Sequence, residues 1–192
     1  MPVIVLSLSG KRPHENRQAP TAYDPPMGQD AETAVAALYR LHYRFLVGLA
    51  VLLVRDMAAA EGLVQDSFVA MHSAWRRLED SDRALSYLHQ AVVSRSRSVL
   101  RHRLAGDKIR PGLAAARPAV ASVTTTELER SALVSALWSL APRQREVLVL
   151  LYYADLSEAQ IASVTGISQG AVKSHAAQAM SSLRAELRGA SL

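Results

Sequence analysis

The stretch "LSEAQIASVTGISQGAVKSH", residues 156–175, predicts two short helices that meet at a sharp bend. Ala162 is small enough to let the two helices approach closely, and Ile167 supplies a buried aliphatic side chain after the bend. Gly166 suits the positive φ that ends a first helix, because glycine has no Cβ to clash there. Ser168 is a good N-cap for the second helix, since its hydroxyl oxygen can accept from free backbone N–H groups. This spacing is that of a helix-turn-helix.

The second of these helices has one apolar side and one small, polar side. Val172, Ala176, Ala179 and Leu183 recur at i, i+4, i+7 and i+11, which is the period of a buried helical stripe. A small, polar outer face can enter the major groove of DNA, where side chains read base edges. A plain helical hairpin with a merely solvated polar face is the alternative on these residues alone. The residues that face away from the stripe are Gly170, Lys173, Ser174, Ala177 and Ser181.

The charge distribution also favours a polyanionic partner. The chain of 192 residues carries 22 Lys and Arg against 17 Asp and Glu, a net charge of +5, and basic residues gather between positions 95 and 117. A solubilising linker is the alternative reading of that segment, but the local excess of cations suits a phosphate backbone better. The segment contains one acidic residue, Asp107. Its basic residues are Arg95, Arg97, Arg101, Arg103, Lys108, Arg110 and Arg117.

Several classes of protein find little support in the composition. The absence of cysteine excludes disulfides and thiol nucleophiles, and it fits a reducing cytoplasm. The longest apolar run, residues 45–54, is much shorter than the roughly 20 residues of a membrane span, and Arg44 and Arg55 bracket it. It therefore predicts a buried core helix and no stable membrane insertion. Because no histidine, carboxylate or glycine-loop pattern marks a metal or catalytic site, we predict neither enzymatic activity nor a cofactor.

The periodicity predicts an all-α chain of two small domains. Helical patterns run through residues 30–104 and resume at residue 127, and no strand alternation appears. The segment between them is rich in Gly, Pro, Ala, Ser and Thr, which is typical of a linker. Met27 lies just before the first helical segment and is a second candidate for the start of translation. The predicted organisation is a disordered tail at 1–29, helical domains at 30–104 and 127–188, and a flexible basic linker at 105–126.

Two blocks of sequence in this order carry a resemblance to a known family. The first block comprises "LYRLHYRFLVGLA", "AEGLVQDSFVAMHSAWRRL" and "SYLHQAVVSRSRSVLRHR". The second is "LAPRQREVLVLLYYADLSEAQIASVTGISQGAVKSHAAQAMSSLRAEL". They resemble regions 2 and 4 of an extracytoplasmic-function sigma factor of the actinobacterial SigE-like type. Such factors form group 4 of the sigma-70 superfamily. The resemblance covers residues 32–103 and 127–187.

The resemblance implies a cytoplasmic transcription initiation factor without chemistry of its own. Region 2 of the family docks on the β′ clamp helices of core RNA polymerase and captures the melted −10 element of the promoter. Region 4 reads the −35 element and touches the β flap. Core RNA polymerase and promoter DNA are therefore the implied partners, with room for an anti-sigma protein as a third.

Residues of this chain that match the family's motifs receive expected roles. Gln65 and Asp66 are expected to contact polymerase, because Leu63, Val64 and Phe68 have the spacing of core residues. Aromatic rings and cations hold unstacked single strands. On this basis the −10 candidates are Trp75, Arg76, Arg77, Tyr87, Ser94, Arg97 and Arg101. Trp75 also has the spacing of a core residue, which is the alternative for this position. The −35 candidates are Arg143, Arg145, Ser168, Gln169, Gly170, Lys173, Ser174, His175 and Arg184.

Some positions depart from the family pattern and keep other functions open. Ser94 stands where the family commonly has Asn, and a hydroxyl lacks the paired donor and acceptor of an amide. A basic residue is frequent where this chain has Leu151, Gln169 and His175. The alternatives are a stand-alone helix-turn-helix regulator and a degenerate sigma factor that acts as an interaction protein. Only a working sigma factor would give a new start site in run-off transcription.

Overall fold

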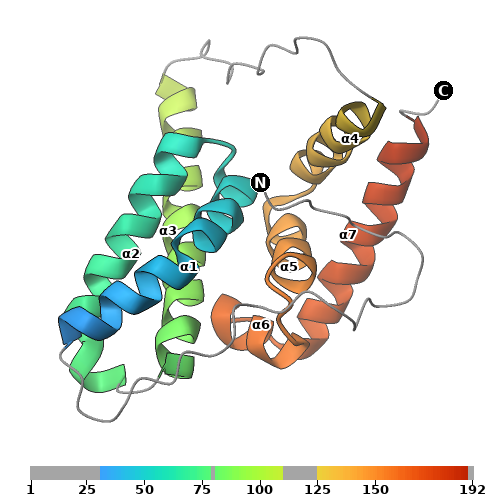
Figure 1. The fold of residues 1–192 in the computed structure, drawn as a ribbon. Coiled ribbons are helices and arrows are strands. Elements are labelled where there is room, and N and C mark those ends of the chain that lie inside the picture. The colour runs from blue at the N-terminus through green and yellow to red at the C-terminus, as the bar shows by residue number, and fades with distance from the viewer. Residues whose placement is uncertain (1–30, 79–80, 110–124, 190–192) are drawn as a thin grey trace.

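The computed structural model describes residues 31–78, 81–109 and 125–189, and it confirms the predicted all-α fold for them. The predicted N-terminal tail lies outside these residues, as does most of the predicted linker. Within the described ranges every regular element is a helix (Figure 1). The helices are α1 (Ala31–Val54), α2 (Met57–Leu78), α3 (Ser81–Ile109), α4 (Thr125–Ser139), α5 (Pro142–Tyr152), α6 (Glu158–Thr165) and α7 (Gln169–Gly189).

Helices α1, α2 and α3 form a first bundle, in which α1 packs against both of the others (Figure 1). Leu38 and Leu46 of α1 meet Met71 of α2 and Leu88 of α3 in its core, and all four side chains are fully buried. Each such side chain contributes about 1.5–3 kcal/mol through removal of apolar surface from water. The bundle is therefore held mainly by the apolar stripes of its three helices.

The bend between α1 and α2 is held by local hydrogen bonds. Asp56 caps α2, because its Oδ1 accepts from the Ala59 backbone N–H at 3.0 Å. The Arg103 guanidinium of α3 donates to the Val54 carbonyl at 2.6 Å and to Asp56 Oδ2 at 2.7 Å. The Ala59 N–H, and after it the Arg103 charge, hold the pKa of Asp56 below its usual value. The end of α3 is thereby tied to the α1–α2 corner.

Helix α1 is long and apolar enough to cross a membrane, and it is the one described helix with these properties. Half of its most apolar window is buried inside the protein. The predicted apolar run at 45–54 supplies much of that burial, with Leu46, Leu49 and Val54 in the core. The core helix of a bundle passes the same test of length and composition, so this helix is explained by the packing of α1 against α2 and α3.

Helices α4 to α7 form a second bundle, in which α7 packs against the other three helices. Ser157 and Gln160 form a capping box at the start of α6. Gly166 ends α6 with φ +71°, and the Ser168 hydroxyl oxygen accepts from the Ala171 N–H at 3.2 Å at the start of α7. The bend predicted from residues 156–175 is therefore confirmed in its local chemistry.

Replacing Gly166 with alanine is expected to destabilise the second bundle. The left-handed conformation costs a residue with a Cβ roughly 1–2 kcal/mol, and no atom lies within 4 Å of that Cβ to add a clash. Gly170→Ala is the matched control, because Gly170 is helical and its Cβ would meet only Ser168 Oγ at 3.9 Å. That change should stabilise by about 0.5–1 kcal/mol. Urea unfolding should shift in opposite directions for the two variants; equal shifts would contradict this account.

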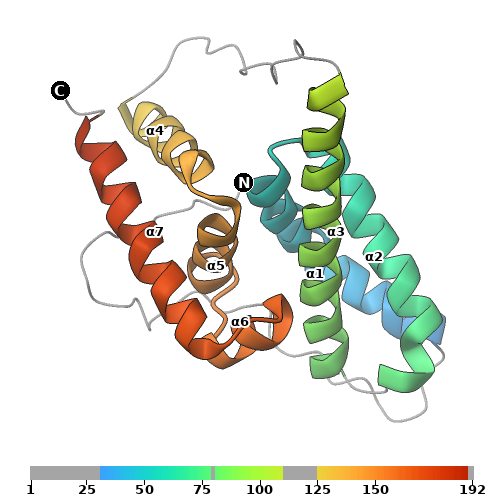
Figure 2. The same ribbon diagram turned by 180° about the vertical axis from the view of Figure 1, so that it is seen from behind.

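The two bundles pack against each other through helices that are far apart in the sequence. Helix α5 lies against α1 and α6 lies against α3, as both views of the molecule show (Figures 1 and 2). The buried side chains of both bundles belong to one continuous cluster. The sequence predicts two domains and a tether but gives no sign of this contact, because its residues come from segments without a shared local pattern.

The ends of α3 and α4 differ from the predicted linker boundaries. Helix α3 continues to Ile109, past the predicted domain end at residue 104, and α4 begins at Thr125 rather than at 127. The glycine at position 106 lies within α3, where a single glycine costs a helix only about 1 kcal/mol. The segment at 110–124 lies outside the described residues.

Candidate nucleic-acid interface

The outer face of α7 has the composition and exposure that the sequence predicts. Val172, Ala179 and Leu183 are fully buried, and Ala176 is half-buried beside them. Most candidates for contact with DNA lie on the opposite side of the helix or at its start. Ser168, Gln169, Gly170, Lys173, Ser174 and Arg184 are all exposed, as are Ala177 and Ser181.

Lys173 already has an ionic partner on this face. Its Nζ lies 3.6 Å from Glu158 Oε2 at the start of α6, and the Lys173 side chain is 67 % exposed. An exposed pair at this distance contributes little, about 0–1 kcal/mol. A phosphate or a base edge can therefore replace Glu158 at small cost.

His175 differs from the other α7 candidates because it is only half-exposed. Its Nδ1 is buried and finds no hydrogen-bond partner among the residues that the structure describes. The position one residue beyond the polar Ser174 turns the imidazole partly toward the bundle. His175 is thus less available to DNA than the sequence suggests.

Arg145, a −35 candidate of the sequence analysis, is buried in the structure. Its side chain lies in α5 with 5 % of the residue exposed, and its Nη1 donates to the Trp138 carbonyl at 3.2 Å. Burial, and after it the nearby charge of Arg55, lowers the pKa of Arg145. Arg143, two residues earlier, is exposed and lies 3.3 Å from Glu146 Oε1. In this conformation only Arg143 of the two is accessible.

The polymerase candidates of α2 lie on its open side. Gln65 and Asp66 are exposed while Leu63, Val64 and Phe68 are buried, as their spacing predicts. The backbone carbonyl of Asp66 accepts from Arg95 Nη2 of α3 at 3.2 Å, which fixes the register of α2 on α3.

Val69 extends this surface and was missed by the sequence analysis. It lies four residues after Gln65, on the same side of α2, and it is 67 % exposed. An exposed valine out of phase with the buried stripe is the signal that could have identified it. The open side of α2 therefore combines an acid, an amide and an apolar side chain.

The −10 candidates separate into buried, exposed and half-buried residues. Trp75 is 9 % exposed and belongs to the core cluster, so its core reading is the one that the structure favours. Arg76 and Arg77 are exposed at the end of α2, and Arg101 is exposed on α3. An indole ring in the core cannot stack on a base without leaving its apolar surroundings.

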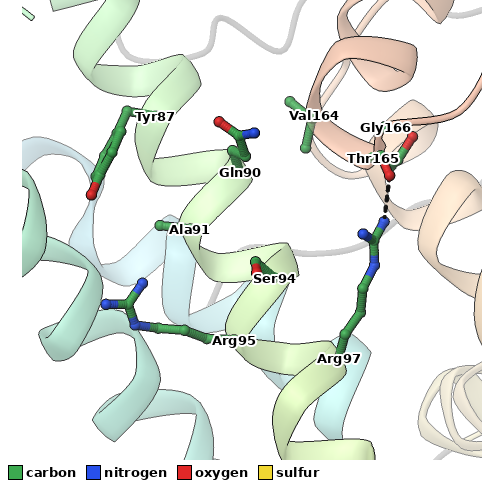
Figure 3. A pocket seen from close by; sticks show the side chains of 9 residues that line it. All are labelled: Tyr87, Gln90, Ala91, Ser94, Arg95, Arg97, Val164, Thr165 and Gly166. Carbon is green, nitrogen blue, oxygen red and sulfur yellow. Dashed lines mark hydrogen bonds between the residues drawn. The ribbon is translucent and has the colours of Figure 1, made fainter.

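The remaining candidates line a cavity of about 370 Å³ between the two bundles (Figure 3). Its α3 wall is formed by Tyr87, Gln90, Ala91, Ser94, Arg95 and Arg97. In Figure 3 Arg97 extends toward α6, whereas Tyr87 and Arg95 extend to the other side of α3. The opposite wall is the end of α6, formed by Val164, Thr165 and Gly166.

Arg97 crosses this cavity and is bound by the second bundle. Its Nε donates to Glu146 Oε2 at 2.8 Å, its Nη2 donates to Glu146 Oε1, and the same Nη2 donates to the Thr165 carbonyl at 3.0 Å. Figure 3 shows the side chain reaching from α3 to the end of α6. Glu146 is thus a site residue that the sequence analysis missed, since it lies 49 residues from its partner.

No group of three or more His, Cys, Asp or Glu residues able to hold a metal ion occurs in the described part of the chain. His42 and His89 are buried together between α1 and α3 without a third ligand.

Both bundles match models of known protein regions. Residues 38–104 match the model described as Sigma-70 region 2, and residues 130–183 match Sigma-70, region 4. The chain is 31 % identical over 135 residues to the RNA polymerase sigma-E factor of Streptomyces antibioticus, covering 70 % of this chain and 74 % of that protein. It is also 31 % identical over 160 residues to the RNA polymerase sigma factor CarQ of Myxococcus xanthus, covering 83 % and 91 %.

A solved structure shares the fold. The sigma factor RpoE from Bartonella quintana, solved in complex with the anti-sigma factor NepR, superposes with a TM-score of 0.70. The match covers 81 % of this chain and 98 % of that one at 22 % identity, which supports a common fold.

Proposed function

Because the chain belongs to the sigma-70 family of RNA polymerase sigma factors, as an extracytoplasmic-function member, we propose that α7 reads the −35 element and α3 holds the melted −10 element. The observation that carries the proposal is the exposed face of α7 behind a well-formed bend. Its small side chains allow the helix backbone close to DNA, and Lys173 stands where a cation reaches a base edge or a phosphate.

The first bundle supplies the complementary contacts in this proposal. Gln65, Asp66 and Val69 dock on the β′ clamp helices, since they form one exposed surface on α2. Tyr87, Ser94 and Arg97 belong to the α3 wall of the cavity, and in this proposal they hold an unstacked base of the −10 strand. Arg76, Arg77 and Arg101 support the phosphates of that strand from the exposed surface.

The chain is a transcription initiation factor, and we propose that it performs no catalysis of its own. The polymerase supplies the active site, and strand opening is driven by binding energy. We place it in the cytoplasm, where RNA polymerase works in bacteria. An anti-sigma protein, the class of partner that RpoE of B. quintana binds in its solved complex, is a further proposed partner.

Lys173→Ala tests whether α7 reads DNA. Promoters are first identified by mapping run-off start sites made with core polymerase, and binding is then measured on −35 variants of one promoter. Loss of a base contact should cost about 1–3 kcal/mol and relax the preference at one position. Loss of a phosphate contact should instead weaken all variants alike and reduce the salt slope by about one.

Arg188→Ala is the matched control for this experiment. Arg188 is an exposed cation on the same helix, several turns from the bend. If Lys173→Ala binds every −35 variant as the parent does, at low and high salt, then α7 is not the reader.

A further inference from the structure

The structure packs the second bundle against the proposed −10 surface of α3, while the proposed −35 face of α7 stays exposed. The end of α6 contacts α3 beside Tyr87, Ser94 and Arg97, so the helices are separated by about 10 Å, the spacing of packed helices. The −35 and −10 elements lie about 25 base pairs apart, which at 3.4 Å per pair is roughly 85 Å. A chain in this closed arrangement cannot bind both elements at once. The two bundles must therefore separate before both elements can be bound.

An ionic contact holds the closed arrangement on the α3 side. The carboxylate of Glu146 accepts two hydrogen bonds from the guanidinium of Arg97, and the Thr165 carbonyl accepts a third. The Glu146 side chain is only 6 % exposed and that of Arg97 is 29 % exposed, so solvent screens the pair weakly. A planar guanidinium binds carboxylate and phosphate with the same two-pronged geometry. Glu146 therefore engages Arg97 with the two-pronged geometry that a phosphate also uses.

An apolar contact holds the closed arrangement on the α1 side. The ring of Tyr153 stacks on Phe45 with centroids 4.9 Å apart, and its hydroxyl donates to the Phe45 carbonyl at 3.2 Å. The hydroxyl lies over Gly48, where a Cβ would come within 2.1 Å of it. Gly48 thus forms a notch in α1 that receives the end of the Tyr153 side chain.

A third contact lies near the apolar one. The Arg55 guanidinium stacks over the Trp138 ring, 4.6 Å from its centroid, and joins the end of α1 to α4. All three contacts cross between the bundles and would be lost together on separation.

We propose that these contacts form an autoinhibitory latch, in which Glu146 occupies Arg97 in place of promoter phosphate while Tyr153 seats in the Gly48 notch. Melted promoter DNA and the latch compete for Arg97, so the free chain binds the −10 strand only from its open form. The inference rests on the proposed role of α3 in −10 binding. The apparent affinity for the −10 strand is then the affinity of the open form multiplied by the fraction of chains that are open.

Glu146→Gln tests the ionic half of the latch, because it keeps the shape of the side chain and removes its charge. The chain has no cysteine, so His72→Cys and Arg188→Cys, both on exposed positions outside the latch, accept a donor and an acceptor dye in the full-length protein. Energy transfer then reports separation of the bundles without DNA. The control is Glu61→Gln, the same chemical change at an exposed position of α2.

The expected result is lower energy transfer for Glu146→Gln and binding to the non-template −10 strand of a mapped promoter that is about tenfold tighter. Glu61→Gln should match the parent in both measurements. Unchanged energy transfer for Glu146→Gln would overturn the latch. Separation without tighter binding would overturn its inhibitory role, and if the parent also fails to bind the strand, the proposed −10 function fails with it.

Gly48→Ala provides a second variant in case the loss of the buried charge disturbs folding. Alanine favours the helix more than glycine does, so α1 should form at least as well, while the added methyl fills the notch against the Tyr153 hydroxyl. Lower energy transfer with undiminished helical circular dichroism supports the latch. Energy transfer equal to that of the parent contradicts the notch.

Discussion

Replacing Val172 with aspartate should unfold the second bundle, although its neighbour Lys173 can be changed without loss of fold. Val172 is fully buried in the core cluster on the inner side of α7. A carboxylate placed there has no cation to pair with on the apolar stripe. An uncompensated buried charge costs about 3–5 kcal/mol, which is a large part of the roughly 5–15 kcal/mol that stabilises a domain.

Urea unfolding followed by circular dichroism measures this effect. Ala177→Asp is the matched control, because it introduces the same charge on the exposed face of the same helix and should change stability by less than about 0.5 kcal/mol. Two variants with equal unfolding midpoints would show that the stripe is not the core of the second bundle.

Acid should destabilise the protein through His89. This side chain is 4 % exposed between α1 and α3, and desolvation, followed by the nearby His42, lowers its pKa from 6.5 to about 4. The neutral form is the folded one, so stability is complete above pH 6.5 and is lost as pH falls toward 4. At 1.36 kcal/mol per pH unit, the loss at pH 5 is about 2 kcal/mol.

The comparison of urea midpoints at pH 7 and pH 5 isolates this contribution. Glutamine at position 89 cannot take up the proton, so the urea midpoints of His89→Gln at pH 7 and pH 5 should differ much less than those of the parent. The remaining difference is due to His42, whose pKa is also lowered by burial. His72→Gln is the control, since His72 is exposed on α2 and should keep the acid sensitivity of the parent. The interpretation fails if both variants behave alike.

The bend and the α7 stripe could be predicted because their causes are local. The αL conformation of Gly166, the cap at Ser168 and the burial of Val172 and Leu183 depend on residues within a few turns of each other. The exposure of Gln65 and Asp66 follows from the phase of α2 in the same way. Local period and capping chemistry fix these features before any tertiary contact forms.

The contacts between the bundles could not be predicted, because their partners are distant in the sequence. Arg97 and Glu146 lie 49 residues apart, and Tyr153 and Phe45 lie 108 apart. The same reason explains Arg145, whose helix α5 is covered on nearly all sides, so that its period does not reveal an outer face. A basic residue in such a helix reads as a surface cation until its neighbours are known.

The fit of Tyr153 against Gly48 of α1 limits which side chains the two regions can carry at these two positions. A residue larger than glycine at position 48 is accommodated in the closed form only if position 153 shrinks or turns away. Region 4 of a relative, grafted onto region 2 of this chain, would therefore have to bring a compatible side chain at that place. Positions 48 and 153 are therefore sterically coupled in the closed form, although they belong to different regions of the chain.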